Sequence, residues 1–427
     1  RGNALFEELC RELEVPFQRC NLAVTVFREE ELFMLELLKA RGEMSAIPVQ
    51  LVGPEELAAL EPTLSSKIKG ALLAPTTAMT SPYRLTIACA ENAAANGARF
   101  YLNTAVTALE QEKGALCGVV TTRGTFRTGC CINAAGVHAG RIAAMAGPPE
   151  FTIHPRKGEL VIFDRELAED HAAIATGILE FTRDPYTKGG GTMITVSGNP
   201  EWGPTACEVC DPEDTAVSAA GLERILDKFG PLLPDFDARN AVINYFAGVR
   251  AATYTEDFHI APSNCLRGLI HVAGIQSPGL AAAPAIAEMV LKILQQEGIE
   301  LVEKESFNPR RREPAPFSEL PLREQNRLIG EDPRYGHIVC RCEQISEREI
   351  VDALNRPLPA LTLDAVKRRT RAGMGRCQGG FCMPRLLGII SRELGIPPEQ
   401  LTKSGPGSPL FSRRVGEPLS SKEADGR

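Results

Sequence analysis

Four of the thirteen cysteines lie close together near the carboxyl end of the chain, at Cys340, Cys342, Cys377 and Cys382. Their spacing is Cys-x-Cys, a long interval, and then Cys-x4-Cys. The other cysteines are scattered and too few to form a disulfide scaffold in 427 residues, which is typical of a reducing compartment. The clustered thiols therefore predict a metal centre, and we expect residues 336–402 to fold as a small all-α module around it.

Helix signals surround both cysteine pairs. Ser346 and Glu349 have the spacing of a capping box, and Pro384 suits the first turn of a later helix. Backbone N–H groups at the starts of helices favour anions, so turns at these places would stabilise a negatively charged centre. Arg341 and Arg376 add positive charge beside the thiols, and the glycines of GMGRCQGGFC let the backbone approach the sulfurs.

Two other interpretations of the four thiols stay open on the residues alone. Structural zinc would bind the same thiolates, although it usually spaces each pair of ligands by two to four residues. Unligated cysteines would need a chance clustering around two glycine turns. The segments CRCEQISEREIVDAL and DAVKRRTRAGMGRCQGGFCMPRL resemble the BFD-like [2Fe–2S] family. That resemblance implies a [2Fe–2S] cluster held by Cys340, Cys342, Cys377 and Cys382.

Charge and hydropathy exclude several classes of protein. The net charge of −7 lacks the basic character of a nucleic-acid binder. The most apolar stretch, Leu269 to Leu294, is interrupted by prolines, glycines and a glutamate, so we expect no membrane-spanning helix. The amino-terminal residues form a charged amphipathic pattern without a signal peptide, which favours the cytoplasm. The length predicts two to three domains.

The larger part of the chain has an α/β pattern. A helix over 84–96 stopped by Gly97 precedes short apolar segments, and a buried strand over 268–273 runs into a helix over 283–296. Residues 150–250 are expected to be mostly β, with Gly189 to Gly191 in a hairpin turn and a helix over 214–229. Further strands are expected over 98–103, 117–121, 125–128 and 130–133.

Three short segments of this part could bind a ligand. In INAAGVHAG a strand ends in small residues, where a flat or phosphorylated ligand could lie against the backbone, although many α/β turns look similar. The segment HVAGIQSPGL repeats this pattern, and a plain strand–helix connection would explain it equally well. In FAGVR, Arg250 follows a strand and could hold a phosphate or carboxylate with two N–H groups, whereas an exposed strand-end arginine is the commoner case.

The order of these segments, together with GALLAPTTAMTSPYRL and HPRKGELVIFD, resembles the FAD-dependent D-amino-acid-oxidase-like superfamily. Within it, the large subunit of the anaerobic-type glycerol-3-phosphate dehydrogenases ends in a BFD-like module too. The resemblance implies that Arg250 holds the anionic group of the substrate. It further implies a set of FAD contacts: Val106 at the adenine, Ala135 and Gly136 at the nucleotide, and Gly274, Gln276, Ser277, Pro278, Gly279 and Leu280 along the isoalloxazine.

One departure concerns the beginning of the family pattern. The family opens with a strand, G-x-G-x-x-G and an acidic ribose ligand, none of which is present in this sequence. We expect that roughly the first 75 residues are absent, the length of a βαβ unit and its following loop, and that the chain as given binds FAD weakly or not at all. The expected domains are 1–305 (cofactor-side 81–149 and 251–298, substrate-side 1–80 and 150–250), a linker over 306–335, the cluster domain 336–402 and a disordered tail 403–427.

The expected fold is thus α/β, an incomplete FAD-binding Rossmann-type domain with a β-rich substrate domain, plus a small all-α [2Fe–2S] module. The expected function is an FAD-dependent dehydrogenase of a small anionic substrate, first of all glycerol 3-phosphate, which passes electrons through the cluster to a second subunit or carrier. A 2-hydroxy-acid or amino-acid dehydrogenase and a non-catalytic electron-transfer subunit remain alternatives. We expect no nucleic-acid partner, and a cytoplasmic protein that could reach the inner membrane face through its partner.

Overall fold

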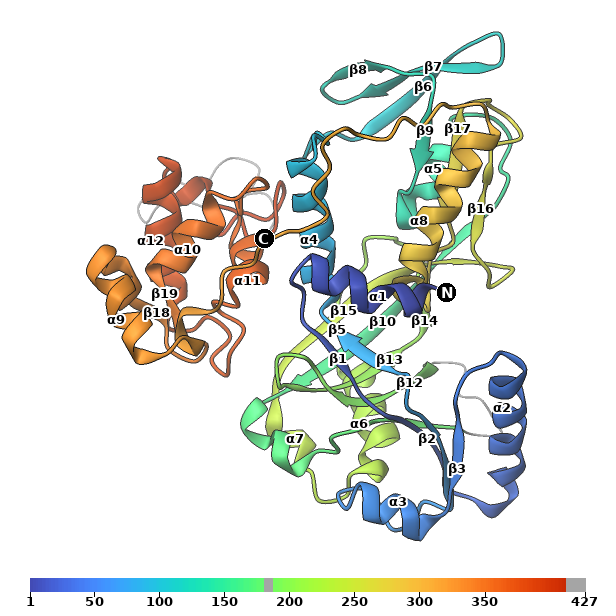
Figure 1. Cartoon of the computed structure of the whole chain (residues 1–427), viewed down its shortest axis with the longest axis vertical. Coiled ribbons are helices and arrows are strands. Elements are labelled where there is room, and N and C mark those ends of the chain that lie inside the picture. Colours follow the sequence, from blue (N-terminus) through green and yellow to red (C-terminus); the bar gives the residue numbers. More distant parts are fainter. Residues whose placement is uncertain (180–186, 412–427) are drawn as a thin grey trace, which may run out of the picture. The chain divides into compact units, whose positions relative to one another are not determined.

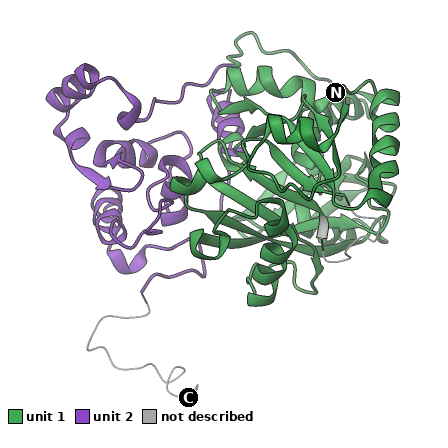
Figure 2. Ribbon diagram, turned by 90° about the horizontal axis from the view of Figure 1, so that it is seen from below, with its two compact units in different colours: residues 1–85, 104–309 green, residues 86–103, 310–427 purple. Residues whose placement is uncertain are grey.

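The computed structural model describes residues 1–179 and 187–411. The chain divides into two compact units, one of residues 1–85 and 104–309 and the other of residues 86–103 and 310–427 (Figure 2). Within the described residues, no helix combines the length and the apolar character that a membrane crossing requires.

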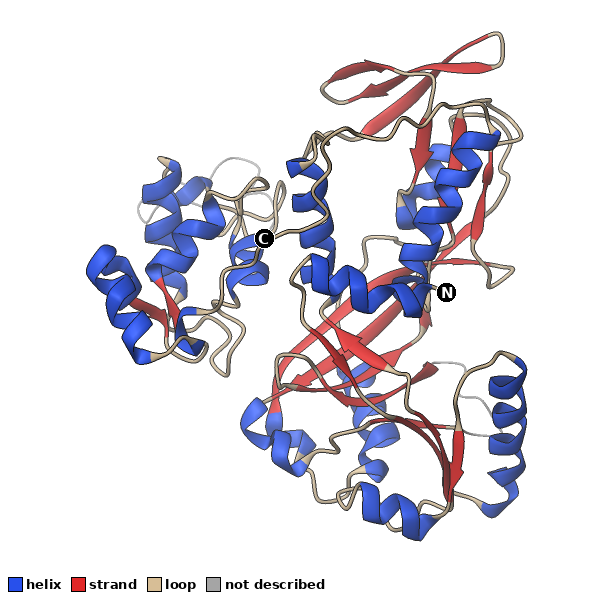
Figure 3. Ribbon diagram, in the orientation of Figure 1, coloured by secondary structure: helices blue, strands red, loops and turns tan. Residues whose placement is uncertain are grey.

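A nine-stranded sheet dominates the first unit (Figures 1 and 3). Its strand order is β14-β10-β13-β12-β11-β2-β4-β3. The ninth strand, β15, lies outside this order and pairs with β10. A core of Phe163, Trp202 and Phe229, all fully buried, lies on one face of this sheet against helix α6. The strands are β2 (Leu22–Val26), β3 (Gln50–Val52), β4 (Gly70–Ala74), β10 (Ile153–Phe163), β11 (Ala175–Ile178), β12 (Thr187–Ile194), β13 (Pro200–Thr205), β14 (Cys207–Glu208) and β15 (Val242–Thr253).

The longest pairing of the sheet joins β10 and β15, which run antiparallel over almost their full lengths. Alternate residues of each strand face the aromatic core, as Val161 and Phe163 do, so the residues between them face the opposite side. Arg156 and Arg250 are direct cross-strand partners in this register and project from that opposite face. The register therefore places two arginines side by side, away from the core.

The remainder of the first unit holds three smaller sheets. A three-stranded sheet has the order β16-β17-β9, in which β17 (Leu269–Ala273) and β9 (Cys131–Asn133) are parallel. The other strands are β16 (His259–Pro262), the sheet of β6 (Val106–Glu112), β7 (Ala115–Thr121) and β8 (Gly124–Arg127), and the pair β1 (Phe17–Arg19) and β5 (Ala78–Thr80). The helices are α1 (Gly2–Glu12), α2 (Leu32–Met44), α3 (Pro54–Leu60), α5 (Ala139–Ala144), α6 (Ala219–Phe229), α7 (Ala238–Ala241) and α8 (Gly279–Gln296).

The second unit is helical apart from one small hairpin. Its core gathers Ile350, Val366, Leu386 and Ile390 from three helices around the buried Cys340 and Cys382. The side chain of Ser346 accepts a hydrogen bond from the Glu349 N–H while Glu349 accepts one from the Ser346 N–H, which confirms the capping box. The elements are most of α4 (Pro82–Ala95), α9 (Leu322–Glu331), α10 (Glu347–Leu354), α11 (Leu363–Thr370), α12 (Met383–Leu394), β18 (Ile338–Cys340) and β19 (Ile345–Ser346).

Short 3₁₀ turns connect several of these elements. In the first unit they are η1 (Glu29–Glu31), η2 (Gly136–His138), η3 (Arg165–Asp170) and η4 (Gly230–Leu232). In the second unit they are η5 (Phe317–Glu319), η6 (Pro333–Gly336) and η7 (Pro398–Gln400).

The structure corrects three local expectations. Residues 98–103 form a loop and not a strand, and the helix expected from 214 begins at Ala219, because Ser218 caps it. Gly189 to Gly191 lie inside β12, where the register shifts, and not in a hairpin turn. A side chain on Gly191 would overlap the Thr176 carbonyl of β11, and one on Gly190 would lie 2.6 Å from the Gly203 carbonyl of β13, so these two glycines serve close strand packing. Most of the expected tail, residues 412–427, lies outside the described residues.

Candidate functional site

The turns predicted to face the flavin leave two neighbouring strands at one edge of the small sheet. In the parallel pairing of β9 and β17, Cys131 lies opposite Leu269 and Asn133 opposite His271. Both strands end close to this rung, one leading into Ala135 and the other into the turn that starts at Gly274. The carboxyl ends of parallel strands are where α/β folds bind ligands, so the two predicted segments share one edge.

Both turns need their glycines. Gly136 has a φ of +56° and Gly274 a φ of +71°, in the left-handed region that other residues disfavour. A Cβ at Gly274 would also lie 2.7 Å from the Thr253 side chain, whereas a Cβ at Gly136 would meet no atom within 4 Å. Neither η2 nor α8 starts with a side-chain cap. The Gly279 N–H of α8 donates to the Gln276 carbonyl, and the N–H groups that follow it in the first turn are suited to oxygen or nitrogen atoms of a ligand.

Gln276 is the most informative residue of the second turn. It is buried, and its amide Nε2 donates to the Glu256 carboxylate at 2.9 Å. Its Oε1 is buried and, within the described part of the chain, has no hydrogen-bond partner. A buried acceptor without a donor is costly, and a flavin ring edge would supply N–H donors. Ser277, Pro278 and Leu280 are exposed beside it, and Gly279 is buried at the start of α8.

A buried polar network lies between the two strand ends. The Asn133 amide donates to the Ala139 carbonyl at 2.9 Å and contacts Nδ1 of His271 at 3.1 Å. His271 reaches Glu150 through Nε2 at 3.2 Å, and the Asn133 Oδ1 accepts from the Ala135 N–H. Burial lowers the pKa of His271, so the neutral imidazole accepts at Nδ1 and donates at Nε2. The network fixes the turn at Ala135.

Val106 is not brought to this edge by any contact in the described residues. It opens β6 opposite Thr121, in the separate sheet of β6, β7 and β8. Its contact with an adenine stays a prediction.

Arg250 occupies the face of the large sheet away from the core. Its two terminal nitrogens both donate to the Thr205 carbonyl at 3.3 Å, and its guanidinium lies directly over Gly158. Burial, followed by the charge of Arg156, lowers the pKa of Arg250. Among residues 1–179 and 187–411 no carboxylate forms an ion pair with it. A half-buried arginine without an anionic partner is suited to an anionic ligand.

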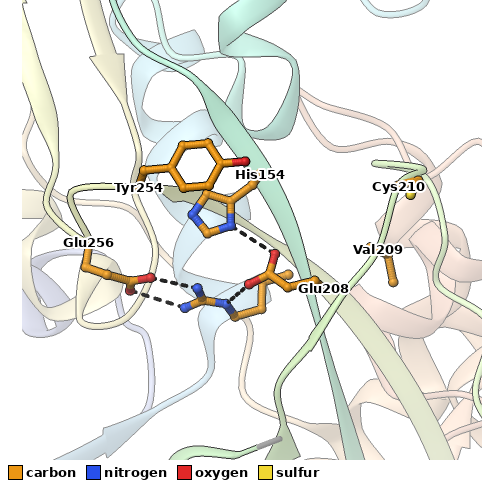
Figure 4. A pocket seen from close by; sticks show the side chains of 7 residues that line it. His154, Glu208, Val209, Cys210, Tyr254 and Glu256 are labelled. Atoms are coloured by element: carbon orange, nitrogen blue, oxygen red, sulfur yellow. Dashed lines mark hydrogen bonds and ion pairs between the residues drawn. The ribbon is translucent and has the colours of Figure 1, made fainter. Parts of the chain in front are cut away.

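Arg156, by contrast, is neutralised on both sides. It donates to Glu208 at 2.8 Å and, with two nitrogens, to Glu256 at 2.7 and 3.2 Å. These residues, with His154 and Tyr254 stacked on each other, line a cavity of about 560 Å³ (Figure 4). Glu256 thus contacts both Arg156 and Gln276 and links Arg156, the cross-strand neighbour of Arg250, to the turn that is predicted to face the flavin. Sequence patterns did not single out Glu256, because no local motif marks a residue that acts through partners far along the chain.

The four clustered cysteines form two pairs in the second unit. Sγ of Cys342 lies 3.6 Å from Sγ of Cys377, and Cys340 and Cys382 are in side-chain contact. Backbone N–H groups of Phe381, Gly379 and Gly380 lower the pKa of Cys377, whereas burial and the neighbouring Cys340 raise the pKa of Cys382 to about 12.

Thiolates crowded in this way require positive charge between them, which metal ions supply. Two pairs suit a [2Fe–2S] cluster, which takes four cysteines on two irons, whereas one zinc ion needs all its ligands around a single point. Among the described residues no three histidine, cysteine or carboxylate side chains are arranged for one ion.

Comparison with known protein families defines the class. Residues 1–293 match the FAD dependent oxidoreductase family, and residues 338–392 match the BFD-like [2Fe–2S] binding domain. The chain therefore belongs to the FAD-dependent oxidoreductases and carries a BFD-like domain for an iron–sulfur cluster. The α/β fold with a small helical cluster domain agrees with the expectation from the sequence.

Within that family, the relatives are more specific. The chain is 38% identical over 417 residues to a glycerol 3-phosphate dehydrogenase of Caloramator mitchellensis, covering 96% of this chain and 85% of the relative. It is 24% identical over 434 residues to one subunit of the anaerobic glycerol-3-phosphate dehydrogenase of Escherichia coli K12, covering 91% of this chain and 76% of that subunit.

A solved structure supports the same relationship. The FAD-bound L-α-glycerophosphate oxidase of Mycoplasma pneumoniae matches with a TM-score of 0.67 and 26% identity, over 74% of this chain and 82% of the other.

Proposed function

We propose that the protein is an FAD-dependent dehydrogenase that oxidises glycerol 3-phosphate and passes the electrons through a [2Fe–2S] cluster in its own small domain. The observation that carries this proposal is the arrangement around Arg250. Its guanidinium has no carboxylate partner among the described residues, and its cross-strand neighbour Arg156 is tied through Glu256 to Gln276 of the flavin-side turn. The proposed anion site and flavin site are thus joined by one cross-strand pairing and two side-chain contacts.

Different residues of the chain would bind the substrate and hold the flavin. Arg250 would bind the phosphate, while Glu208 and Glu256 cancel the charge of Arg156 so that one cation faces the substrate. Gln276 would contact the flavin through its free Oε1, and the Asn133 network would hold the turn at Ala135. Bound FAD would accept a hydride from the substrate carbon, and the cluster would carry single electrons onward. Binding and orientation are therefore the part that these side chains supply.

We further propose that Cys340, Cys342, Cys377 and Cys382 are the cluster ligands, and that Ala135, Gly136, Gly274, Gln276, Ser277, Pro278, Gly279, Leu280 and Val106 contact FAD. The electron acceptor would be a second subunit or carrier, as the word "subunit" in the name of the Escherichia coli relative suggests. The protein would work in the cytoplasm, at the inner face of the membrane if that partner is anchored there.

The test is anaerobic flavin bleaching. Protein reconstituted with FAD and iron is titrated with glycerol 3-phosphate, and absorbance is followed at about 450 nm, where flavins absorb. Bleaching by glycerol 3-phosphate but not by glycerol is expected. Arg250→Lys, which keeps the charge but loses the two-pronged donor, should raise the substrate concentration for half-maximal bleaching about 10- to 100-fold, as the loss of charged hydrogen bonds predicts.

Two outcomes would contradict the proposal. Faster bleaching by a 2-hydroxy acid or an amino acid would indicate that Arg250 holds a carboxylate. The absence of bleaching by any of these substrates in the presence of excess FAD would indicate an electron-transfer subunit. Arg239→Lys, which changes an exposed arginine paired with Glu223, serves as the matched control.

A further inference from the structure

The face around the cysteine pairs of the second unit carries apolar side chains in contact with solvent. Phe381 is 82% exposed although it lies between the two cysteines Cys377 and Cys382, and Cys382 itself is 1% exposed. Met383 follows at 41% exposure. A large aromatic ring in water next to a redox centre, together with Met383, forms an apolar patch of the kind that marks protein contact surfaces.

The segment that carries two of these cysteines is rich in arginine. The segment 371–392, which contains two of the four cysteines, has four arginines and no acidic residue. Residues 336–402 hold 10 Lys and Arg against 7 Asp and Glu, a net charge of +3. The whole chain has 47 Lys and Arg and 54 Asp and Glu. The residues outside 336–402 therefore hold 37 Lys and Arg and 47 Asp and Glu, a net charge of −10. The cluster domain is thus a basic patch on an acidic protein.

The arginines around the cysteines differ in whether a carboxylate of the same domain already forms an ion pair with them. Arg371 is paired with Glu343 at 2.7 Å, and Arg392 with Glu347 at 2.6 Å. Arg341 stands between Cys340 and Cys342, and Arg385 follows Cys382 by three residues. Both Arg341 and Arg385 are exposed, and in the part of the chain that the structure describes neither forms an ion pair.

A groove of about 590 Å³ continues this face. It lies between β18, which ends at Cys340, and α12, which starts directly after Cys382. Ile338, Val339 and Ile389 contribute apolar surface. Glu347 and Arg392, which pair with each other, also line the groove, and Arg385 adds a cation. The groove therefore flanks the Cys340–Cys382 pair with apolar surface and the charge of Arg385.

We propose that this face is the docking surface for an acidic electron-carrier protein, whose carboxylates surround its own redox centre. Those carboxylates would contact Arg341 and Arg385, and apolar side chains of the carrier would pack against Phe381 and into the groove. This inference rests on the proposed function, since it names where electrons would leave. One electron would move from the reduced cluster to the oxidised centre of the carrier, with no bond made or broken. Anionic lipid is the less suitable occupant, because membrane-binding segments usually carry four to eight cations, whereas the argument here rests on two, Arg341 and Arg385.

The experiment separates docking from catalysis. Full-length protein with its cluster reduced by dithionite, freed of excess reductant, is mixed with an acidic or a basic c-type cytochrome, and haem reduction is followed by absorbance. Titration calorimetry between the oxidised proteins gives the affinity without electron transfer. Neither measurement needs substrate turnover, so a failed flavin-bleaching test and a failed docking test are distinguishable.

The acidic cytochrome should be reduced at least about tenfold faster than the basic one at low salt, and this preference should disappear at about 300 mM salt. Arg385→Glu should weaken binding of the acidic cytochrome about tenfold and Phe381→Ser about fivefold, while the rate with a small neutral quinone stays unchanged. Arg323→Glu, the same charge change at an exposed position on α9, should leave both rates unchanged.

Three results would overturn the proposal. The first is an equal rate of reduction for the two cytochromes. The second is a rate of electron transfer that falls equally with quinone and with cytochrome in Arg385→Glu and Phe381→Ser. The third is binding of the wild-type chain to vesicles of anionic lipid that Arg385→Glu abolishes. Iron and labile-sulfide content of each variant, expected to equal that of the wild type, exclude loss of the cluster as the cause.

Discussion

At the scale of single residues, the guanidinium of Arg250 lies flat across Gly158 of the neighbouring strand and reaches the Thr205 carbonyl. The absence of a side chain at Gly158 is what gives the arginine this position. A Cβ there would overlap Nη2 of Arg250. The proposed anion site therefore depends on two strands, and of Arg250 and Gly158 only the arginine carries a charge.

Replacing Gly158 by alanine should displace the Arg250 guanidinium and raise the glycerol 3-phosphate concentration for half-maximal flavin bleaching about tenfold, the effect of losing one good hydrogen bond to an ion. The measurement is the same anaerobic bleaching titration. Gly230→Ala is the control, because Gly230 has helical φ and a Cβ there meets no atom within 4 Å. Equal titration curves for the two variants would show that Gly158 does not position the arginine.

His171 gives a prediction about pH. It is buried, its Nε2 accepts from the Trp202 indole N–H at 2.9 Å, and its Nδ1 donates to the Ala172 carbonyl. Burial lowers its pKa below the ordinary value of 6.5, so the unfolded chain binds a proton more readily than the folded one. Stability should therefore be full above about pH 6.5 and fall as the pH drops below it, by at most about 1.4 kcal/mol per pH unit for one proton.

Substitution His171→Gln keeps an acceptor for Trp202 but removes the titrating group. Denaturant unfolding of wild type and variant between about pH 7 and pH 5 should show a smaller loss for the variant. His271 has the same sign of shift and is present in both proteins, so the difference between them isolates His171. Parallel pH profiles would mean that the proton is not taken up at His171.

Among the residues of the proposed site, the sequence could single out some and not others. Arg250 and Gln276 stand in short segments with recognisable neighbours, so the sequence alone could propose roles for them. Glu256 and Arg156 could not, because their importance arises from a pairing between positions 100 residues apart. The contact of Asn133 with His271 likewise requires the parallel register of β9 and β17.

At the scale of elements, the turns that carry the cysteines pack too closely for side chains. A Cβ at Gly375 would overlap the Cβ of Cys342, one residue of the pair formed with Cys377. Gly388, in the middle of α12, has no atom within 4 Å of such a Cβ. Gly375 and Gly388 therefore serve different purposes, and of these two it is Gly375 that packs against a cysteine of the cluster.

Gly375→Ala should lower the iron content well below two atoms per chain, because the turn must move away from Cys342. Gly388→Ala should keep the full iron content and stabilise the domain by roughly 0.5–1 kcal/mol, since alanine favours a helix interior. Iron analysis and thermal unfolding check both variants. Full iron in the Gly375 variant would show that the turn adapts at no cost.

Elements with strong local signals were predictable, and elements set by distant partners were not. The capping box at Ser346 and the proline at the start of α12 mark their helices in the sequence alone. By contrast, Gly189 to Gly191 have the composition of a turn but lie in a strand, where the adjacent backbones of β11 and β13 leave no room for side chains at Gly190 and Gly191. Residues 98–103 are apolar enough for a strand, yet they form a loop in the structure.

At the scale of the whole molecule, two units with separate hydrophobic cores hold separate proposed cofactors. The core of the second unit includes Cys340 and Cys382 themselves. Loss of iron would leave these thiols buried side by side, where burial already raises the pKa of Cys382. The stability of this unit should therefore depend on its metal in a way that the stability of the first unit does not.

Removal of iron by an anaerobic chelator should lower the melting temperature of one calorimetric transition by several degrees and leave the other unchanged, as expected for a ligand that binds one folded unit. Cys342→Ser, which removes a proposed ligand at the less buried pair, should reproduce the shift without chelator. Cys89→Ser, at an exposed cysteine outside the cluster, is the control. A single transition that shifts as a whole would contradict independent units.

The antiparallel rung that joins Arg156 to Arg250 has a consequence for how such a protein can change over time. Side chains alternate between the two faces of a strand, so one inserted or deleted residue in β15 before position 250 would turn the arginine into the aromatic core. Substitutions along β10 and β15 can therefore change the substrate preference of the proposed site during evolution. Insertions or deletions within these two strands cannot, because they would remove Arg250 from its position. Loop insertions elsewhere are free of this restriction, and lineages that vary in size should vary there.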